Sequence, residues 1–341
     1  MYKNYIDSLI ENKELPGAVL YVSKKRQLQC YKAAGSFIGA DGQNYPITES
    51  TLFDVASLTK VVATLPASLL LVSKGDLHLE KQVKHYLPEF RHEKVRVEDL
   101  LTHRSGLPPD LPYVARDGQR DVMDVIYRTE LRQDPGISVA YSDLGMIILG
   151  KIIEKTTGQS LDIFTKEQIF TPWGLHNTRF NLPLDMKAFS ASTEKFGTSF
   201  IQGKVHDEKA LHLGGVSGSA GLFSTAKDIE RFAAHFLYPE EQDVIPPDLM
   251  RMATHHKQNN RGLGFEVWNG EGDPLSCGQS WPIGSFGHTG FTGTSVWVDP
   301  ENELIVAFLT NAVHYGRSTN IRTIRKTLHS MIHSSIQGET S

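Results

Sequence analysis

The sequence predicts an α+β protein in which an antiparallel sheet, built from both ends of the chain, carries a mainly helical insertion. Strand patterns occur near both ends, at residues 18–35 and 294–309, whereas helical periodicity dominates from about residue 57 to residue 180. Amphipathic patterns at residues 2–11 and 321–332 predict a helix at each end that flanks the sheet. A cleft between the sheet and the insertion is the natural place for chemistry.

The first part of the chain predicts two strands and a long buried helix. Residues 18–25 and 27–35 form a strand pair, and residues 40–52 form a loop. An apolar stripe with helical spacing follows and is closed by Gly75. Its members are Leu58, Val61, Val62, Leu65, Leu69 and Val72. Pro66 lies inside this stripe and predicts a kink or an early break, because proline lacks the N–H that an interior helical position donates.

The middle of the chain predicts a second buried helix and then irregular structure. Apolar residues between 144 and 153 have helical spacing, whereas residues 181–213 show no clear period. A run of small residues, 214–224, comes next. Thr225 and Asp228 then form a plausible pair of helix-capping residues.

The last part of the chain predicts an antiparallel hairpin from residues 294–299 and 304–309. No repeat, low-complexity tract or linker divides the chain. We therefore expect a single catalytic unit over residues 1–341, in which 1–56 and about 214–341 form the sheet region. Residues from about 57 to 213 form the mainly helical region.

The composition is that of an ordinary soluble globular protein, with 341 residues of which 40% are hydrophobic and 22% charged. Lys and Arg number 35 and Asp and Glu 39, so the formal net charge is −4. This charge excludes a strongly basic nucleic-acid-binding or membrane-surface protein. The two cysteines, Cys30 and Cys277, have no metal-binding or redox spacing, which excludes a disulfide scaffold and a cysteine-rich zinc module.

Targeting signals are not visible in the sequence. Residues 2–11 have amphipathic helical spacing rather than the continuous apolar run of a secretory signal. The most apolar stretch, residues 61–72, is interrupted by Pro66 and Ser68, so we expect no membrane span. These observations predict a cytoplasmic protein, with a leader replaced by Met1 as the alternative.

The first chemical motif is FDVASLTK at residues 53–60. Ser57 lies where loop becomes helix, and Lys60 follows on the same helical face one turn later. A serine hydroxyl needs a neighbouring base to become a nucleophile, and a helix N-terminus favours the developing negative charge. Taken alone, the same residues also fit a capping serine and a solvated lysine.

Two further motifs are compatible with catalysis. In DPGISVAYSD, residues 134–143, Tyr141 precedes a helix and could transfer a proton, and Asp143 could bond a nearby lysine. In FGHTGF, residues 286–291, His288, Thr289 and Gly290 lead into a predicted strand whose edge could bind a substrate amide. The alternatives are a half-buried tyrosine with a capping aspartate, and a turn with a surface histidine.

Together, Ser-x-x-Lys, Tyr-Ser-x and His-Thr-Gly in this order resemble the serine β-lactamase and penicillin-binding-protein superfamily. The match is closest to the group that contains class C β-lactamases, D-Ala-D-Ala carboxypeptidases, D-aminopeptidases and esterases. DLLTHRSGLP at 99–108 and GLFSTAKDIERF at 221–232 agree, and the resemblance spans about residues 14–312. It implies the β-lactamase/transpeptidase-like fold. The segment 202–221 also resembles a branch of cell-wall amidases, although relatives there often have histidine at the position of Ser219.

The resemblance implies a role for each motif residue. Ser57 would be acylated, Lys60 would take or relay its proton, and Tyr141 would protonate the leaving group and help to activate the deacylating water. The backbone N–H groups of Ser57 and Phe291 would form the oxyanion hole. His288 and Thr289 would contact a substrate carboxylate or carbonyl.

Two residues depart from the usual pattern of the superfamily. Asp143 stands where most relatives have asparagine, and an ionised carboxylate can accept hydrogen bonds but cannot donate them. We expect it to keep Lys60 protonated and to disfavour efficient penicillin hydrolysis. His288 replaces the usual lysine and predicts a weaker, pH-dependent anion site. From the sequence we therefore expect a substrate without the β-lactam carboxylate, or an activity that rises as the pH falls because His288 becomes protonated.

We therefore expect a bacterial serine hydrolase that works through an acyl-enzyme on Ser57, without cofactor or metal. The favoured function is an amidase or peptidase acting on peptidoglycan-derived peptides. The alternatives are a class C-like β-lactamase, a carboxylesterase and a non-catalytic sensor of penicillins or muropeptides. A metal site at residues 206–208 is a weaker alternative to a solvated polar loop. The expected partner is a small-molecule or peptide substrate rather than a nucleic acid.

Overall fold

The computed structural model describes residues 1–112, 115–118 and 121–338. Within this part of the chain, the main sheet has seven antiparallel strands in the order β3-β2-β1-β12-β11-β10-β9. They are β1 (Gly17–Lys24), β2 (Gln27–Ile38), β3 (Asn44–Pro46), β9 (Glu266–Val267), β10 (Phe286–Thr289), β11 (Ser295–Asp299) and β12 (Leu304–Thr310). Strands from the two ends of the chain meet where β1 pairs with β12, as the sequence predicts.

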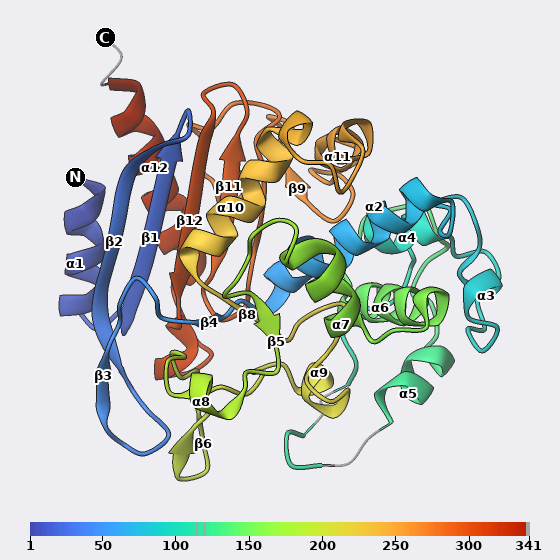
Figure 1. The fold of residues 1–341 in the computed structure, drawn as a ribbon, viewed down its shortest axis with the longest axis horizontal. Coiled ribbons are helices and arrows are strands. Elements are labelled where there is room, and N and C mark those ends of the chain that lie inside the picture. The colour runs from blue at the N-terminus through green and yellow to red at the C-terminus, as the bar shows by residue number, and fades with distance from the viewer. Residues whose placement is uncertain (113–114, 119–120, 339–341) are drawn as a thin grey trace.

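Helices cover both faces of this sheet (Figure 1). Successive side chains of a strand point to opposite faces. Val19 of β1 therefore joins the hydrophobic cluster that includes α10 (Ala226–Leu237). Its neighbour Leu20 joins the cluster that includes α1 (Tyr2–Glu11) and α12 (Ile321–Gly338). The central strands are buried on both sides, which is why β12 reads as a continuous apolar run.

The insertion lies beside the sheet and is mainly helical (Figure 1). Its helices are α2 (Leu65–Lys74), α3 (Val83–Tyr86), α4 (Val97–Leu101), α5 (Val122–Arg128), α6 (Asp143–Thr157), α7 (Leu161–Thr165), α8 (Leu184–Lys187) and α9 (Glu208–His212). Another helix, α11 (Pro247–Thr254), follows α10. The short strands are β4 (Phe53–Asp54), β5 (Arg179–Phe180), β6 (Lys195–Phe196), β7 (Ser199–Phe200) and β8 (Leu222–Ser224). Strand β8 pairs with β4 and β5, so it ties the segment before Ser57 to the small-residue run.

The chain accommodates Pro66, where the sequence predicts a kink or an early break, by a change of helix type. A 3-10 turn at Ala56–Leu58 and a π-helical turn at Lys60–Thr64 precede α2, so Pro66 falls in its first turn. A first-turn position needs no backbone N–H donor, and the wider π turn reduces the clash of the proline ring with the preceding turn. Of the described helical segments, Ala56–Lys74 is the one long and apolar enough to cross a membrane, but 83% of its apolar window is buried in this fold.

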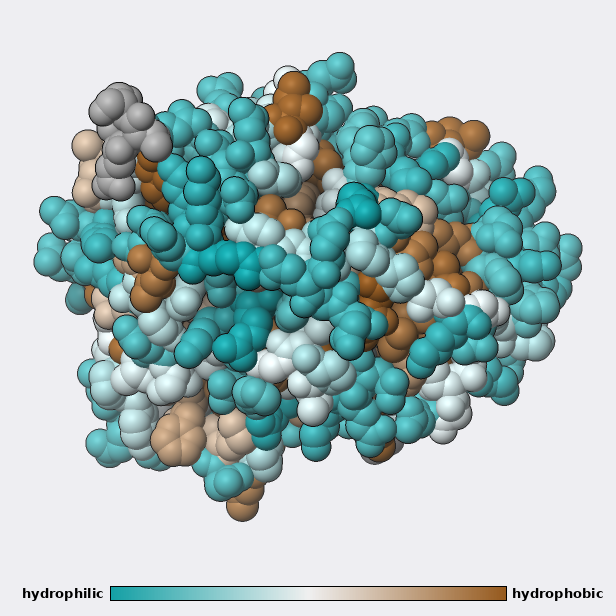
Figure 2. Space-filling view, turned by 45° about the horizontal axis from the view of Figure 1, so that its top comes forward, coloured by the Kyte–Doolittle hydropathy of each residue, from teal (hydrophilic) through white to brown (hydrophobic). Residues whose placement is uncertain are grey.

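The structure corrects one expectation about local structure and confirms another. Phe286–Thr289 is itself strand β10 and forms a hairpin with β11, whereas the sequence pattern predicts a turn here, before the strand. Thr225 caps α10 by accepting a hydrogen bond from the Asp228 backbone N–H, as expected. The molecular face shown in Figure 2 is mostly hydrophilic, with apolar side chains in scattered patches.

Candidate active site

Ser57 is presented by a strained turn at the start of the buried helical segment. The residue before it, Ala56, has a φ of 47°, in the left-handed region that non-glycine residues rarely adopt. Buried Asp54 stabilises this turn by accepting a hydrogen bond from the Ala56 N–H at 2.9 Å. The other carboxylate oxygen of Asp54 accepts a bond from the backbone N–H of His206 at 2.7 Å. One side chain thus joins the nucleophile turn to the segment before α9.

Lys60 contacts Ser57, the candidate nucleophile, directly. Its Nζ donates to Ser57 Oγ at 2.8 Å and to the backbone oxygen of Ser219 at 2.9 Å, and its side chain is fully buried. The small-residue run brings Ser219 this close because it packs tightly on α6. A Cβ at Gly218 would lie 2.0 Å from the backbone oxygen of Met146. The run that the sequence left unassigned therefore helps to fix the lysine.

Tyr141 and Asp143 complete the group that the Ser-x-x-Lys and Tyr-Ser motifs predict. Lys60 Nζ lies 2.8 Å from Asp143 Oδ1 and 5.1 Å from the centre of the Tyr141 ring. Burial alone would lower the pKa of Lys60, but the Asp143 carboxylate outweighs it and raises that pKa. Burial raises the pKa of Tyr141, although the Lys60 charge opposes this shift. At neutral pH the site therefore holds an ammonium, a carboxylate and a neutral phenol.

The turn after β10 is fastened to the segment before Ser57. Thr292 Oγ1 donates to the backbone oxygen of Asp54 at 2.7 Å, and Thr294 Oγ1 donates to that of Val55 at 3.1 Å. Gly290 permits this approach, because a Cβ there would lie 2.4 Å from the Val55 oxygen. The predicted oxyanion donors, the N–H groups of Ser57 and Phe291, therefore belong to two segments held against each other.

A buried arginine of the C-terminal helix supports the same turn from behind. Arg325 on α12 donates to the backbone oxygens of Gly290 at 2.5 Å, Gly293 at 3.1 Å and Thr294 at 2.8 Å. No sequence pattern singles out this residue, because a lone arginine on an amphipathic helix carries no recognisable signal. The last helix thus positions a loop of the candidate active site.

His288 lies beside Tyr141, with the two ring centres 6.0 Å apart. Its Nδ1 is 2.8 Å from the backbone oxygen of Thr289 and donates to it. Burial, followed by the charges of Arg261 and Lys60, holds the pKa of His288 well below its usual value, so the ring is uncharged at neutral pH. The expected pH-dependent anion site at His288 is therefore not supported, because this buried ring stays neutral where the sequence predicted that it would titrate.

Arg261 and His103 also surround Tyr141, and no sequence motif predicts either of them as a site residue. The guanidinium carbon of Arg261 lies 5.3 Å from the centre of the Tyr141 ring, and the His103 ring centre lies 4.5 Å from it. Within the described residues, Arg261 Nη1, His103 Nε2 and His288 Nε2 are buried and have no hydrogen-bond partner. Arg261 therefore supplies a positive charge that does not depend on the protonation of His288.

The segment at residues 206–208 has structural partners. His206 Nε2 lies 3.2 Å from Glu194 Oε1, and the His206 ring stacks on Phe291 with centres 5.7 Å apart. Asp207 caps α9, and Glu208 pairs with Arg317. Within the residues that the structure describes, no group of three His, Cys, Asp or Glu side chains is arranged to bind a metal.

The comparisons with known proteins identify the family of this chain. A family model described as Beta-lactamase matches residues 3–329. The chain is 34% identical over 344 residues to a putative D-alanyl-D-alanine carboxypeptidase of Escherichia coli (strain K12), covering 88% of this chain and 79% of that protein. It is 33% identical over 364 residues to an N-acetylmuramyl-L-alanine amidase of Bacillus subtilis (strain 168), covering 91% and 80%.

Solved structures show the same fold. A class C β-lactamase superposes with a TM-score of 0.76 at 21% identity, covering 98% of this chain and 96% of that chain. EstCE1, a hydrolase with promiscuous acyltransferase activity, also gives 0.76, at 19% identity and with 96% and 97% covered. The fold and the matched sequence define a serine hydrolase. The chain belongs to the β-lactamase family.

Proposed function

We propose that this hydrolase cleaves an amide bond in peptidoglycan-derived peptides through an acyl-enzyme on Ser57. The observation that carries the proposal is the 2.8 Å contact between Lys60 Nζ and Ser57 Oγ, at the start of a buried helical segment and beside Tyr141. The sensor alternative needs the same acylation but not the release that follows it.

In the proposed reaction, Ser57 Oγ bonds to the substrate carbonyl carbon and its proton passes to the Lys60–Tyr141 pair. The C–N bond breaks as Tyr141 gives a proton to the leaving nitrogen, which leaves an ester on Ser57. Water then attacks this ester, releases the acid and restores the hydroxyl. Because Lys60 and Tyr141 both hold protons at rest, the pair must lose one proton before the serine is activated.

The cation beside Tyr141 supports a substrate with a free carboxylate near the scissile bond. Arg261 Nη1 is unpartnered among the described residues, and its Nη2 lies 3.4 Å from Glu266, a long contact for an ion pair. A substrate carboxylate would satisfy this guanidinium with charge-assisted hydrogen bonds. A carboxypeptidase-type substrate fits this arrangement better than a simple ester.

The mechanism is tested by labelling the protein with a fluorescent penicillin and locating the labelled peptide by mass spectrometry. We expect label on Ser57, none in the Ser57→Ala variant, and normal labelling in Ser73→Ala, a control on the same buried helical segment. Label elsewhere, or label that persists in Ser57→Ala, would contradict the mechanism.

The substrate is tested with a panel of muropeptides, D-amino-acid peptides and p-nitrophenyl esters. We expect the highest kcat/KM for an amide substrate and a slow loss of the penicillin label. Fast nitrocefin hydrolysis would favour a β-lactamase, and a preference for short esters over every amide would favour an esterase. A label that never leaves, with no turnover of the panel, would favour a sensor.

A further inference from the structure

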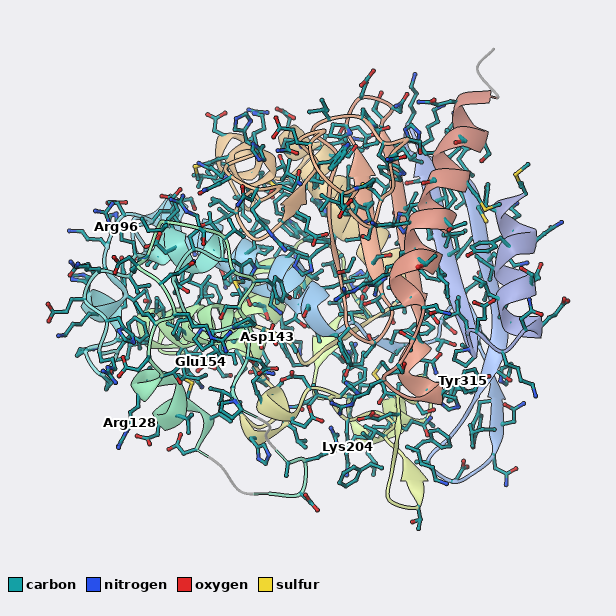
Figure 3. All side chains as sticks on the ribbon, turned by 180° about the vertical axis from the view of Figure 1, so that it is seen from behind. Arg96, Arg128, Asp143, Glu154, Lys204 and Tyr315 are labelled. Atoms are coloured by element: carbon teal, nitrogen blue, oxygen red, sulfur yellow. The ribbon has the colours of Figure 1, made fainter. Side chains whose placement is uncertain are left out.

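A second buried lysine lies on the far side of Asp143 from Lys60. Lys209 belongs to α9, and its side chain is only 6% exposed. Its Nζ lies 2.9 Å from Asp110 Oδ1, 2.9 Å from Asp207 Oδ2 and 3.4 Å from Asp143 Oδ2. Asp143, at the start of α6, lies near the middle of the molecule (Figure 3).

The two lysines divide one carboxylate between them. Lys60 pairs with Asp143 Oδ1 at 2.8 Å, whereas Lys209 faces Oδ2. Burial alone would raise the pKa of Asp143, but the two ammonium groups outweigh it and lower that pKa. The carboxylate is therefore ionised, and each lysine receives only part of the stabilisation that it can give.

Lys209 keeps its positive charge. Burial alone would lower its pKa, but Asp207, Asp143 and Asp110 together raise it strongly. The other titratable or charged groups around Lys60 and Asp143 are Tyr141 before α6, His103 after α4, His288 of β10 and Arg261 after α11. Within the described part of the chain, Lys209 is the cation that contacts Asp143 Oδ2, the oxygen that does not pair with Lys60.

We propose that Lys209 is a positioning residue of this active site, which orients Asp143 and weakens its hold on the Lys60 ammonium. The inference rests on the proposed function. Without Lys209, the whole Asp143 carboxylate would stabilise the Lys60 ammonium, so Lys60 would release its proton only at higher pH. Lys209 thereby offsets part of the effect of having aspartate rather than asparagine at position 143.

The test is the pH dependence of Ser57 acylation by a fluorescent penicillin in the wild type, Lys209→Met, Lys209→Arg and Asp110→Asn. The acylation rate should rise with pH as Lys60 loses its proton. Removing the nearby cation in Lys209→Met should shift the midpoint of this rise upward by about one pH unit, which lowers the rate at neutral pH about tenfold. Lys209→Arg keeps the charge and should keep the midpoint near that of the wild type.

Asp110→Asn should shift the pH midpoint of acylation in the opposite direction from Lys209→Met. A variant that merely misfolds would not produce this opposite shift. Asp110 is 58% exposed, and without its charge Lys209 binds Asp143 more strongly, so the midpoint should move to lower pH. A purely structural role would lower the rate at every pH and leave the midpoints unchanged, which would overturn the proposal. If the wild type is not labelled on Ser57, the proposed function itself fails; if it is labelled and all midpoints coincide, only the inference about Lys209 fails.

Discussion

Lys60 and Asp143 form a buried ion pair, with Lys60 Nζ 2.8 Å from Asp143 Oδ1, in the middle of the candidate active site. The lysine that contacts Ser57 is therefore paired with a carboxylate rather than with a neutral amide. This pairing decides which protonation state the resting site adopts, and it sets the direction of the first two predictions.

Replacing Asp143 with asparagine should make the protein a better β-lactam hydrolase. The change removes the charge that stabilises the Lys60 ammonium and adds an N–H donor for a substrate carbonyl. We expect nitrocefin turnover at pH 7 to rise by about tenfold, the equivalent of one pKa unit. Asp185→Asn, the same substitution at an exposed position on α8, is the matched control and should change nothing. An unchanged or lower rate in Asp143→Asn would contradict the role given to this carboxylate.

The acylation rate of the wild type should increase with pH through the neutral range. The pKa values of Lys60 and Tyr141 are both raised, by Asp143 and by burial respectively, so both groups are protonated at pH 7. The fraction of sites with one proton fewer then grows by about tenfold per pH unit until the lower of the two pKa values is reached. Stopped-flow measurement of acylation from about pH 6 to about pH 10 follows this increase in rate. A rate that increases toward acid pH would point instead to protonation of His288.

Loss of the Arg261 guanidinium should affect substrates according to their charge. In Arg261→Met, we expect KM for a peptide with a free C-terminal carboxylate to rise by about tenfold or more, because a charge-assisted bond is lost. The C-terminally amidated form of the same peptide should show a much smaller change. Steady-state kinetics on the peptide pair gives the answer, and equal losses for both forms would exclude a carboxylate-binding role.

A methyl group at Gly290 should disrupt the turn that carries Phe291, the proposed second oxyanion donor. Its Cβ would lie 2.2 Å from Thr294 Oγ1 and 2.4 Å from the Val55 oxygen, so one of these segments must move. We expect Gly290→Ala to lose most of its acylation rate and about 1–3 kcal/mol of stability.

Gly145→Ala is the matched control for that substitution. Gly145 lies within α6, and its nearest neighbour would be 3.6 Å from the added Cβ, an ordinary contact. Alanine favours a helix over glycine by about 1 kcal/mol, so this variant should be as stable as the wild type or more stable. Thermal unfolding and acylation assays compare the two variants, and equal effects would contradict the steric account of Gly290.

Local pattern was sufficient to predict much of this protein. The apolar periodicities predict the terminal helices, the β1–β2 and β11–β12 strand pairs and the buried helical segment, because each depends on neighbours within a few residues. The spacing of Ser57 and Lys60 also fixes their contact, since residues three apart on a helix share a face. The family resemblance then pointed to Tyr141, Asp143 and His288, and the structure places all three around this pair.

The tertiary structure alone decided what surrounds that pair. Lys209, Arg261 and Arg325 come from distant segments, and no spacing along the chain relates them to Ser57. Their positions depend on how α9, the loop after α11 and the last helix pack against the insertion and the sheet. The protonation of Lys60 depends on burial and on charges brought together by this packing. The sequence thus determined which groups could react, whereas the packed layers determined their charges and orientation.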